Sequence, residues 1–382
     1  MKILMAHASA ELYGSDRVFA ESVRALRDAG HEVVVTLPQD GPLASALGEV
    51  VVCPVPVLRK AALRPSGLIG LLRETASSLR PMVRLIRTHR PDVLYVNTVT
   101  VPLWLPLARL FGTRVLAHVH EAEDGVAAPI RVALAAPLLA AHTVVVNSLA
   151  TGEVLHRALP SLAARTRLIY NGVPGAPVTP VPGPGLRIVL VGRISPRKGT
   201  DVAVRALALL RRDGIDATLD LVGSIFPGYE WFSDELDALI KDGDLAGSVR
   251  LSGFRDDVWD AYAHADVAIV PSRVEPFGNT AVEAQLAGVP VIVTDAQGLP
   301  ETVSSGAAHG RRGAVVPADD AEALAAELRK VAENPGAATE KARLASVEAT
   351  GLFAPQRYRA EIVSVLSTLP RRRPRRARSS RG

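Results

Sequence analysis

The chain is poor in cysteine, in aromatic residues and in long apolar runs. Its 382 residues include a single cysteine, Cys53, which excludes an internal disulfide and a cysteine-ligated zinc site and favours a reducing compartment. The most apolar run, residues 132–146, is broken by Pro137 and His142 and is too short to span a bilayer. The N-terminal residues lack the long apolar core of a signal peptide. We therefore expect a cytoplasmic protein.

Aromatic residues make up 4% of the chain, whereas hydrophobic residues make up 48%. This alanine-, valine- and leucine-rich composition is typical of helices packed on parallel sheets. Apolar segments separated by amphipathic ones predict strands at residues 2–7, 32–37, 92–97, 114–119 and 143–147, and again at 186–192, 218–222, 249–252 and 267–270. Such β–α–β alternation predicts an α/β protein with right-handed crossovers in parallel sheets.

Residues 174–185 are rich in proline and glycine and show no periodic pattern, so we interpret them as a linker. The α/β halves on either side predict two Rossmann-like domains facing across a cleft, at residues 1–173 and 186–352. Residues 353–370 are predicted to form a C-terminal helix that packs back on the first domain.

Basic charge is concentrated at the C-terminus. Residues 371–382 hold seven arginines and no acidic residue, which leaves 37 of the 44 basic residues against 39 acidic residues elsewhere. We predict a disordered basic tail, which either only maintains solubility or attracts anionic lipid headgroups. A nucleic-acid partner is not expected, because no aromatic residues are interleaved with the charge.

A second basic feature lies in residues 58–90, where we predict helical structure with a break near Pro81. Four arginines share one helical face beside an apolar stripe, namely Arg73, Arg80, Arg84 and Arg87 next to Leu72, Leu79, Val83 and Ile86. Such a face either lies on a membrane surface or belongs to a solvated helix docked on a sheet.

Residues 271–302 combine a helix N-terminus with two carboxylates. Glu275 and Glu283 flank the turn that opens a short helix, formed by Phe277, Gly278, Asn279 and Thr280. A helix N-terminus beside acidic side chains suits a ligand that carries both phosphates and hydroxyls. Alternatively, Glu283 forms a capping box with Thr280, and Glu275 is an exposed loop residue. Spacing alone leaves both interpretations open.

Residues 192–200 (GRISPRKGT) follow a predicted strand and have the look of a phosphate loop. The order Lys198-Gly199-Thr200 does not fit a Walker loop, and no G-x-G-x-x-G follows an early strand, which disfavours nicotinamide or flavin binding. Arg193 and Lys198 remain as two cations near a helix start, where they would neutralise a diphosphate or would simply be solvated.

Candidate residues in the first half also lie at strand ends. Gly14 and Ser15 come where a strand gives way to a helix, with Ser15 as the expected cap, and they bind a ligand or only cap the helix. His120 follows the strand predicted at 114–119. The pair Asp242 and Asp244 resembles a metal-binding Asp-x-Asp, but it lies in a turn after a helix rather than at a strand end, so no metal site is expected there.

Together these motifs resemble the signature of the retaining glycosyltransferase family 4 of the GT-B superfamily, also called glycosyl transferases group 1. The family's two glutamates separated by seven residues correspond to Glu275 and Glu283. Further matching segments are VPS at 270–272, LAGVPVI at 286–292, GLPE at 298–301, VGRISPRKG at 191–199 and IYNGV at 169–173.

The resemblance implies a GT-B fold and a retaining transfer of a sugar from a nucleotide-diphosphate sugar to a glycan, lipid or small-molecule acceptor, without a metal or other cofactor. The C-terminal domain would hold the donor, and the N-terminal domain would lie on the acceptor side. The implied catalytic residues are His120, Arg193, Lys198 and Glu275. The implied donor contacts are Gly14, Ser15, Phe254, Arg255, Phe277, Gly278, Asn279, Thr280 and Glu283.

The residues Gly14-Ser15-Asp16 depart from the two glycines and a glutamate that are frequent in the family. Two other functions stay open: a nucleotide-sugar epimerase of the same fold, and a non-catalytic module that binds sugar nucleotides. The expected partners are a nucleotide-sugar donor, an acceptor, and an anionic inner membrane face if the arginines of residues 73–87 and the tail attach there peripherally.

Overall fold

The computed structural model describes residues 1–58, 65–121, 124–225, 228–304, 310 and 312–370. The predicted basic tail, residues 371–382, lies outside the described residues. Contacts between Cα atoms divide the chain into two compact units. Of the described residues, those within 1–147, 151–170 and 358–370 form the N-terminal unit, and those within 148–150 and 171–357 form the C-terminal unit.

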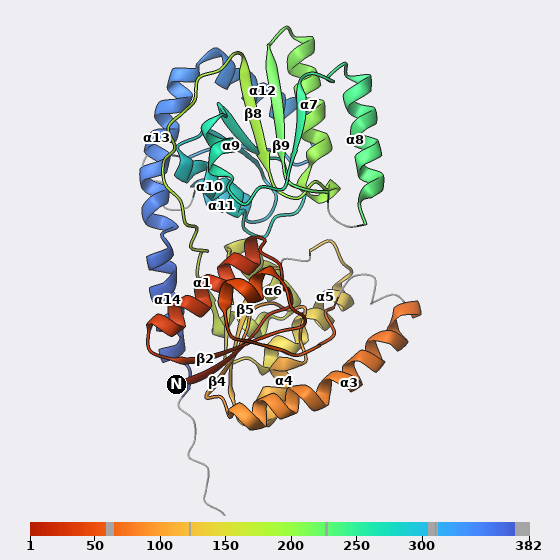
Figure 1. Cartoon of the computed structure of the whole chain (residues 1–382), viewed down its shortest axis with the longest axis vertical. Helices are drawn as coiled ribbons and strands as arrows, with labels where there is room; N and C mark the ends of the chain where they lie inside the picture. The colour runs from red at the N-terminus through yellow and green to blue at the C-terminus, as the bar shows by residue number, and fades with distance from the viewer. Residues whose placement is uncertain (59–64, 122–123, 226–227, 305–309, 311, 371–382) are drawn as a thin grey trace, which may run out of the picture. The chain divides into compact units, whose positions relative to one another are not determined.

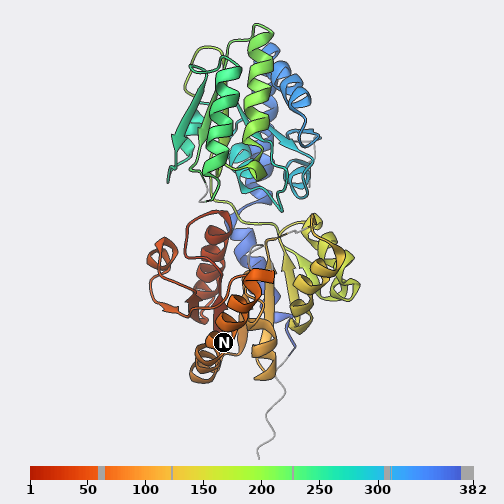
Figure 2. The same cartoon turned by 90° about the vertical axis from the view of Figure 1, so that its right-hand side faces the viewer.

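The N-terminal unit contains a parallel sheet in the order β3-β2-β1-β4-β5-β6-β7. In Figure 2 the red segments of this unit, from the start of the chain, lie on one side and the yellow segments, which include β6, lie on the other. The strands are β1 (Lys2–Ala6), β2 (Glu32–Leu37), β3 (Val50–Val52), β4 (Val93–Val96), β5 (Arg114–Val119), β6 (Thr143–Val146) and β7 (Thr166–Leu168). The order reverses direction between β1 and β4, as in a doubly wound fold.

Helices cover both faces of this sheet. One face packs against α1 (Gly14–Asp28), α2 (Pro42–Leu47) and α14 (Pro355–Ser367). The other face packs against α3 (Pro65–His89), α4 (Trp104–Leu110), α5 (Ala128–Ala135) and α6 (Leu149–Ala158). The central strands β4 and β6 are fully buried and rich in valine, as parallel strands covered on both faces require.

Most of α14 belongs to the N-terminal unit, although it is the last helix of the chain (Figure 1). The Tyr358 ring is fully buried, and its hydroxyl lies 2.5 Å from the Ser22 hydroxyl of α1. Beside it, Arg359 Nε donates a hydrogen bond of 2.8 Å to Glu21. Helix α14 therefore completes the hydrophobic core beneath α1.

Two local predictions for this unit were wrong. Helix α3 continues through Pro81, because residues on both sides of the proline, Ser78, Met82 and Ile86, are buried on one face, and this packing outweighs the lost hydrogen bond. Ser15 does not cap α1: the N-cap is Tyr13, whose backbone N–H donates to the Asp16 carboxylate at 2.9 Å in a capping box.

The C-terminal unit contains a parallel sheet in the order β10-β9-β8-β11-β12-β13. Its strands are β8 (Leu186–Val191), β9 (Ala217–Val222), β10 (Val249–Gly253), β11 (Val267–Val270), β12 (Val291–Thr294) and β13 (Ala314–Val316). The order again reverses at one point, between β8 and β11. The α/β class with two Rossmann-like domains is therefore confirmed.

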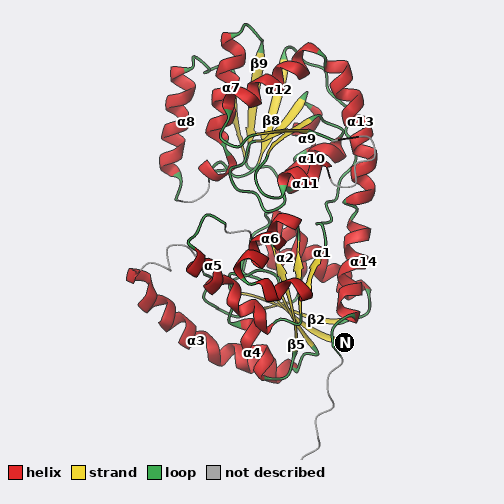
Figure 3. Ribbon diagram, turned by 180° about the vertical axis from the view of Figure 1, so that it is seen from behind, coloured by secondary structure: helices red, strands yellow, loops and turns green. Residues whose placement is uncertain are grey.

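Figure 3 shows the strands of the C-terminal unit in yellow between helices. One face packs against α7 (Thr200–Arg212), α8 (Glu230–Asp242) and α12 (Ala321–Glu333). The other packs against α9 (Trp259–Ala263), α10 (Asn279–Ala287) and α11 (Leu299–Ser304), and α13 (Pro335–Leu352) contacts α10.

The proline- and glycine-rich segment at 174–185 has neither helix nor strand. It is nevertheless attached to the C-terminal unit, because the backbone N–H groups of Val178 and Val181 donate to the carbonyls of Ala287 and Ala263. Within the described part of the chain, none of the helices has the length and apolar character needed to cross a membrane.

Candidate active site

The loops that follow β8 and β11 meet where the strand order of the C-terminal unit reverses. Ligands of open α/β sheets bind at the carboxyl ends of the strands at such a point. The loop after β8 carries Lys198, and the loop after β11 carries Glu275. Lys198 Nζ lies 2.5 Å from Glu275 Oε2, and the two side chains retain 23% and 13% of their accessible surface. The structure therefore brings these two predicted residues into one ion pair.

The ion pair lies in a region of excess positive charge. Burial raises the pKa of Glu275, but the hydrogen bond and charge of Lys198, together with the charges of Arg197 and Arg193, outweigh burial and hold this pKa below its ordinary value. Glu275 is therefore ionised at neutral pH. Three cations act on one carboxylate, which leaves positive charge for a phosphate ligand.

Two glycines allow the loops around this pair to approach closely. Gly199 has φ +66°, and a Cβ atom there would lie 1.9 Å from the Pro271 carbonyl oxygen. Gly278 has φ +108°, and its Cβ would lie 2.4 Å from the Leu299 side chain. Only glycine fits both the backbone angle and the space at these positions. Gly199 therefore lets the Lys198 loop pack against Pro271, and Gly278 lets the Glu275 loop pack against Leu299.

Helix α10 begins beside Glu275. Its N-cap is Gly278, and no side-chain cap is found there within the described ranges, so the capping-box interpretation of Thr280 and Glu283 is wrong. The Thr280 hydroxyl oxygen is buried and has no hydrogen-bond partner among the described residues. Glu283 instead lies near Tyr262, whose hydroxyl is 3.5 Å from its Oε2. In the first turn of α10 the N–H groups of Ala281 and Val282 donate to the Gly278 carbonyl, and no side chain caps this end of the helix among the described residues.

The other predicted donor contacts of the C-terminal unit differ in their burial and in their distance along the sheet from the Lys198–Glu275 pair. Phe277 is 2% exposed and packs edge-on against the Phe353 ring at 5.9 Å, so its side chain is buried rather than presented to a ligand. Phe254 is 51% exposed in the loop after β10, and Arg255 pairs with Asp260 at 3.2 Å. Because β10 is the edge strand, two strands from β8, this loop starts away from the Lys198–Glu275 pair.

In the N-terminal unit, His120 directly follows β5 and is 9% exposed. Its Nε2 lies 3.1 Å from Asn97 Oδ1, and its Nδ1 lies 3.5 Å from Asn147 Nδ2. Burial, followed by the charges of His118 and His7, lowers the pKa of His120 well below its ordinary value. His120 is therefore a neutral ring with polar partners on both nitrogens. Gly14 and Ser15 are exposed in the first turn of α1.

Two further residues of this unit, His7 and Asp16, were not predicted as site residues from the sequence. His7 Nε2 lies 2.8 Å from Asp16 Oδ1, and both side chains are buried. His7 is the first residue after β1, next to the point where the strand order of the N-terminal sheet reverses. Its position at the end of a predicted strand could have marked it as a candidate site residue. Asp16 was visible only as a departure from the family pattern.

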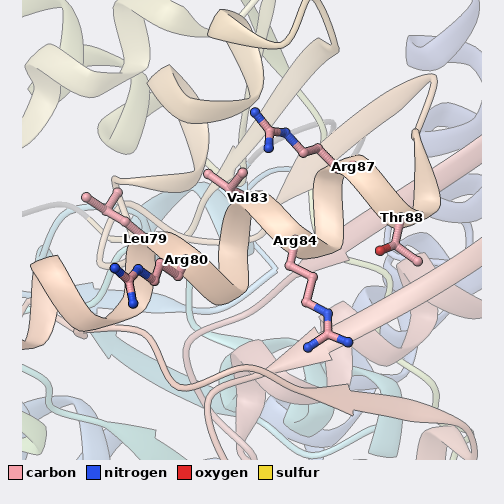
Figure 4. Close-up of a pocket in the computed structure, with 6 residues that line it drawn as sticks. All are labelled: Leu79, Arg80, Val83, Arg84, Arg87 and Thr88. Atoms are coloured by element: carbon pink, nitrogen blue, oxygen red, sulfur yellow. The ribbon is translucent and has the colours of Figure 1, made fainter.

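Helix α3 carries a surface cavity that contains none of the site residues described above. It has a volume of about 420 Å³ and is lined by Leu79, Arg80, Val83, Arg84, Arg87 and Thr88, whose side chains project from the helix (Figure 4). Of the predicted apolar stripe, Leu72 and Leu79 are 61% and 40% exposed, whereas Ile86 is buried. Arg87 lies over the Phe111 ring at 5.4 Å.

Asp242 ends α8 and Asp244 follows it in a turn. Among the described residues, no group of three or more His, Cys, Asp or Glu side chains is arranged to hold a metal ion.

Family models match both units. Residues 13–174 match the model described as Glycosyltransferase Family 4, and residues 178–347 match the model described as Glycosyl transferases group 1. The two matches together span most of the chain.

Individual proteins similar to this chain are also named as sugar-transferring enzymes. The chain is 30% identical to a glycogen synthase of Mycobacterium tuberculosis over 70% of this chain and 66% of the relative, just under two thirds of that protein's length. It is 28% identical to the phosphatidyl-myo-inositol mannosyltransferase of Mycolicibacterium smegmatis, over 81% of this chain and 78% of that protein. The crystal structure of Anabaena Alr3699/HepE in complex with UDP and glucose superimposes with a TM-score of 0.80 and 23% identity, covering 97% of this chain and all of that one.

Proposed function

Because the chain belongs to glycosyltransferase family 4 of the GT-B superfamily, we propose that it transfers a sugar from a nucleotide-diphosphate sugar to an acceptor, with retention of the anomeric configuration and without a metal. The observation that carries this proposal is the Lys198–Glu275 pair at the switch point of the C-terminal sheet. This pair places surplus positive charge, which would bind a diphosphate, beside a carboxylate, which would accept hydrogen bonds from sugar hydroxyls.

The donor would bind along the carboxyl edge of this sheet. Its diphosphate would lie against Arg193, Lys198 and the first turn of α10, where backbone N–H groups and the helix dipole favour anions. The Thr280 hydroxyl, which lacks a described partner, would donate to the same ligand. Glu283 would accept hydrogen bonds from the ribose, and Glu275 from the transferred sugar.

The proposed chemistry is breakage of the bond between the anomeric carbon and the diphosphate oxygen. Negative charge then develops on the leaving diphosphate, where Arg193 and Lys198 stabilise it more strongly than in the ground state. The acceptor hydroxyl attacks from the face that the diphosphate leaves, and the diphosphate takes its proton. These steps require no additional base on the opposite face.

Two observations bear on the donor and acceptor. Alr3699/HepE, the structural relative, was crystallised with UDP and glucose, and curated relatives are named as glycogen synthase and as mannosyltransferases. We therefore propose a hexose donor, with glycan, lipid and small-molecule acceptors as the classes to screen.

The test is a panel of UDP- and GDP-hexoses in which nucleoside diphosphate release and the fate of the sugar are both recorded. The proposal expects release with one donor, and an α-configured product from an α-configured donor. Release of an isomerised free sugar or nucleotide sugar, with no acceptor product, would instead identify the epimerase alternative. Binding of a donor without turnover for any acceptor class would identify a binding module.

The α3 surface favours a second property of the same enzyme, peripheral attachment to anionic membranes. Arg80 and Arg84 are exposed beside the exposed Leu79, so this surface joins positive charge to apolar area. Such a surface attracts anionic headgroups and inserts apolar side chains at the interface. An acceptor carried on a lipid would then be met at the membrane.

A further inference from the structure

Four neighbouring strands of the N-terminal sheet each end at a polar residue. His7, Asn97, His120 and Asn147 are the first residues after β1, β4, β5 and β6, and these strands are adjacent in that order. The register pairs Ala6 with Val96 and Val119 with Val146, which brings His7 beside Asn97 and His120 beside Asn147. The carboxyl edge of the sheet therefore carries a continuous row of imidazole and amide side chains.

Hydrogen-bond distances connect this row into one chain of donors and acceptors. Thr151 Oγ1 donates to Asn147 Oδ1 at 3.0 Å, and Asn147 Nδ2 lies 3.5 Å from His120 Nδ1. His120 Nε2 lies 3.1 Å from Asn97 Oδ1, and Asn97 Nδ2 lies 3.2 Å from His7 Nδ1. The chain ends where His7 Nε2 meets Asp16 Oδ1 at 2.8 Å.

The carboxylate at the end of this chain gives it a direction. An ionised carboxylate only accepts hydrogen bonds, so His7 carries a proton on Nε2. In a neutral His7 ring, Nδ1 then accepts from the Asn97 amide, and the Asn97 oxygen is left to accept from a proton on His120 Nε2. His120 Nδ1 accepts from Asn147 in turn. Each bond fixes the polarity of the next.

We propose that Asp16, acting through His7 and Asn97, holds His120 as the neutral Nε2–H tautomer and so acts as a positioning residue for the active-site histidine. The second carboxylate oxygen of Asp16 accepts from the Tyr13 N–H at 2.9 Å, so the same side chain also fixes the loop that precedes Gly14 and Ser15. Since both ring nitrogens of His120 are engaged by fixed amides, His120 orients its surroundings rather than transferring a proton. The link to sugar transfer rests on the proposed function, but the tautomer itself does not.

A competing arrangement is open to the same atoms. His7 Nδ1 also lies 3.1 Å from the Asn97 carbonyl oxygen, which would accept a proton from it. A proton at that nitrogen would rotate the Asn97 amide, reverse the remaining bonds and place the His120 proton on Nδ1. The two arrangements therefore differ in one observable, the nitrogen of His120 that carries hydrogen.

The experiment is two-bond ¹H–¹⁵N correlation NMR on the full chain with ¹⁵N-labelled histidine, with the His120 signals assigned by their loss in His120→Gln. Wild type is expected to show His120 as Nε2–H. Asp16→Asn keeps an oxygen for the Tyr13 N–H but presents an N–H to His7 Nε2, so His7 must move its proton to Nδ1 and His120 is expected to become Nδ1–H. Asp28→Asn, an exposed position at the other end of α1, is the matched control and should leave His120 unchanged.

Asn97→Ala provides a second variant in case Asp16→Asn does not fold. It removes the acceptor of the His120 Nε2 proton, so a mixture of both tautomers is expected. An Nδ1–H tautomer in wild type, or an unchanged Nε2–H tautomer in Asp16→Asn or Asn97→Ala, would overturn the proposal.

Kinetics separate this proposal from the proposed function. With a donor that turns over, Asp16→Asn is expected to lower kcat about tenfold while the donor KM stays within about twofold. Equal losses in Asp16→Asn and Asp28→Asn would overturn the positioning role. If wild type transfers no sugar, the proposed function fails while the NMR result still decides the tautomer.

Discussion

Lys198 and Glu275 lie 77 residues apart in the chain, yet their side chains form an ion pair of 2.5 Å because their loops follow the adjacent strands β8 and β11. This pair is not a simple stabilising salt bridge, since Arg193 and Arg197 add positive charge around the same carboxylate. A phosphate ligand would compete with Glu275 for Lys198. The two residues therefore have opposite effects on an incoming diphosphate, which makes their roles separable by mutation.

Loss of Lys198 should remove transition-state stabilisation. Lys198→Ala is expected to lower sugar transfer by about a hundredfold or more, because its charge opposes charge that develops on the leaving diphosphate. Lys198→Arg keeps the charge and should recover part of the rate. Steady-state kinetics with the donor identified by the panel measure both, and a rate for Lys198→Ala close to that of wild type contradicts the assignment.

Glu275 should make stability depend on acid pH. Its pKa in the folded protein is lower than its ordinary value, so its ionised form stabilises the fold at all pH values above the unfolded pKa, and this stabilisation is lost as pH falls through the folded pKa. Glu275→Gln should therefore unfold at lower denaturant concentration than wild type at pH 7, and the difference should disappear in strong acid. Denaturant melts from pH 7 down to pH 3 test this. A difference that grows as the pH falls would have the wrong sign.

Gly278 should be intolerant of a side chain. Gly278→Ala places a Cβ atom within 2.4 Å of Leu299 at a φ of +108°, and we expect a loss of about 1–3 kcal/mol in the free energy of unfolding. Gly336→Ala is the control, since nothing lies within 4 Å of its Cβ position in the first turn of α13. Equal stabilities of the two variants in chemical denaturation would show that the loop is not packed as described.

The C-terminal helix should stabilise the N-terminal unit. Tyr358→Ala deletes a fully buried ring of α14, and we expect a loss of about 3–5 kcal/mol. Tyr358→Phe removes only the hydroxyl bonded to Ser22 and should cost about 1 kcal/mol. Guanidinium unfolding measures both, and a near-neutral Tyr358→Ala would mean that α14 is not part of this core.

Membrane attachment should depend on α3 and on ionic strength. The double variant Arg80→Glu, Arg84→Glu should lose binding to vesicles containing anionic phospholipid in a sedimentation assay, because both arginines are exposed beside Leu79. A chain truncated after residue 370 separates the contribution of the tail, and neutral vesicles give the background. If the full chain does not sediment with anionic vesicles at low salt, the membrane proposal is wrong.

The sequence predicted the longer strands well because each is a continuous apolar segment, as in β2, β5 and β11, whose bounds match the structure. It missed β3, β7 and β13, which have three residues each and too little length for a period. It also missed α13, whose alanine-rich sequence has only a weak apolar face. Pairing between adjacent strands, rather than local pattern, places these elements.

In the candidate site too, local sequence pattern identified some residues, whereas others depend on which strands are neighbours. Glu275 and Lys198 were found by motif, but no spacing rule reveals that they touch, since that depends on β8 and β11 being neighbours. His120 was found after its strand, whereas His7, Asn97 and Asn147 occupy equivalent places and were not singled out. Their role emerges only when strand order and register bring them side by side.

The most direct test of the Lys198–Glu275 site is calorimetric titration of UDP or GDP, whichever nucleotide the donor panel selects, into wild type, Lys198→Ala and Glu275→Gln. Lys198→Ala is expected to weaken nucleoside diphosphate binding by about tenfold or more, because a charge-assisted contact is lost. Glu275→Gln should bind the same ligand at least as tightly as wild type, because the competing carboxylate is gone, and yet transfer no sugar. Weaker binding by Glu275→Gln together with unchanged binding by Lys198→Ala would show that Lys198 does not bind the diphosphate and that Glu275 does not compete with it.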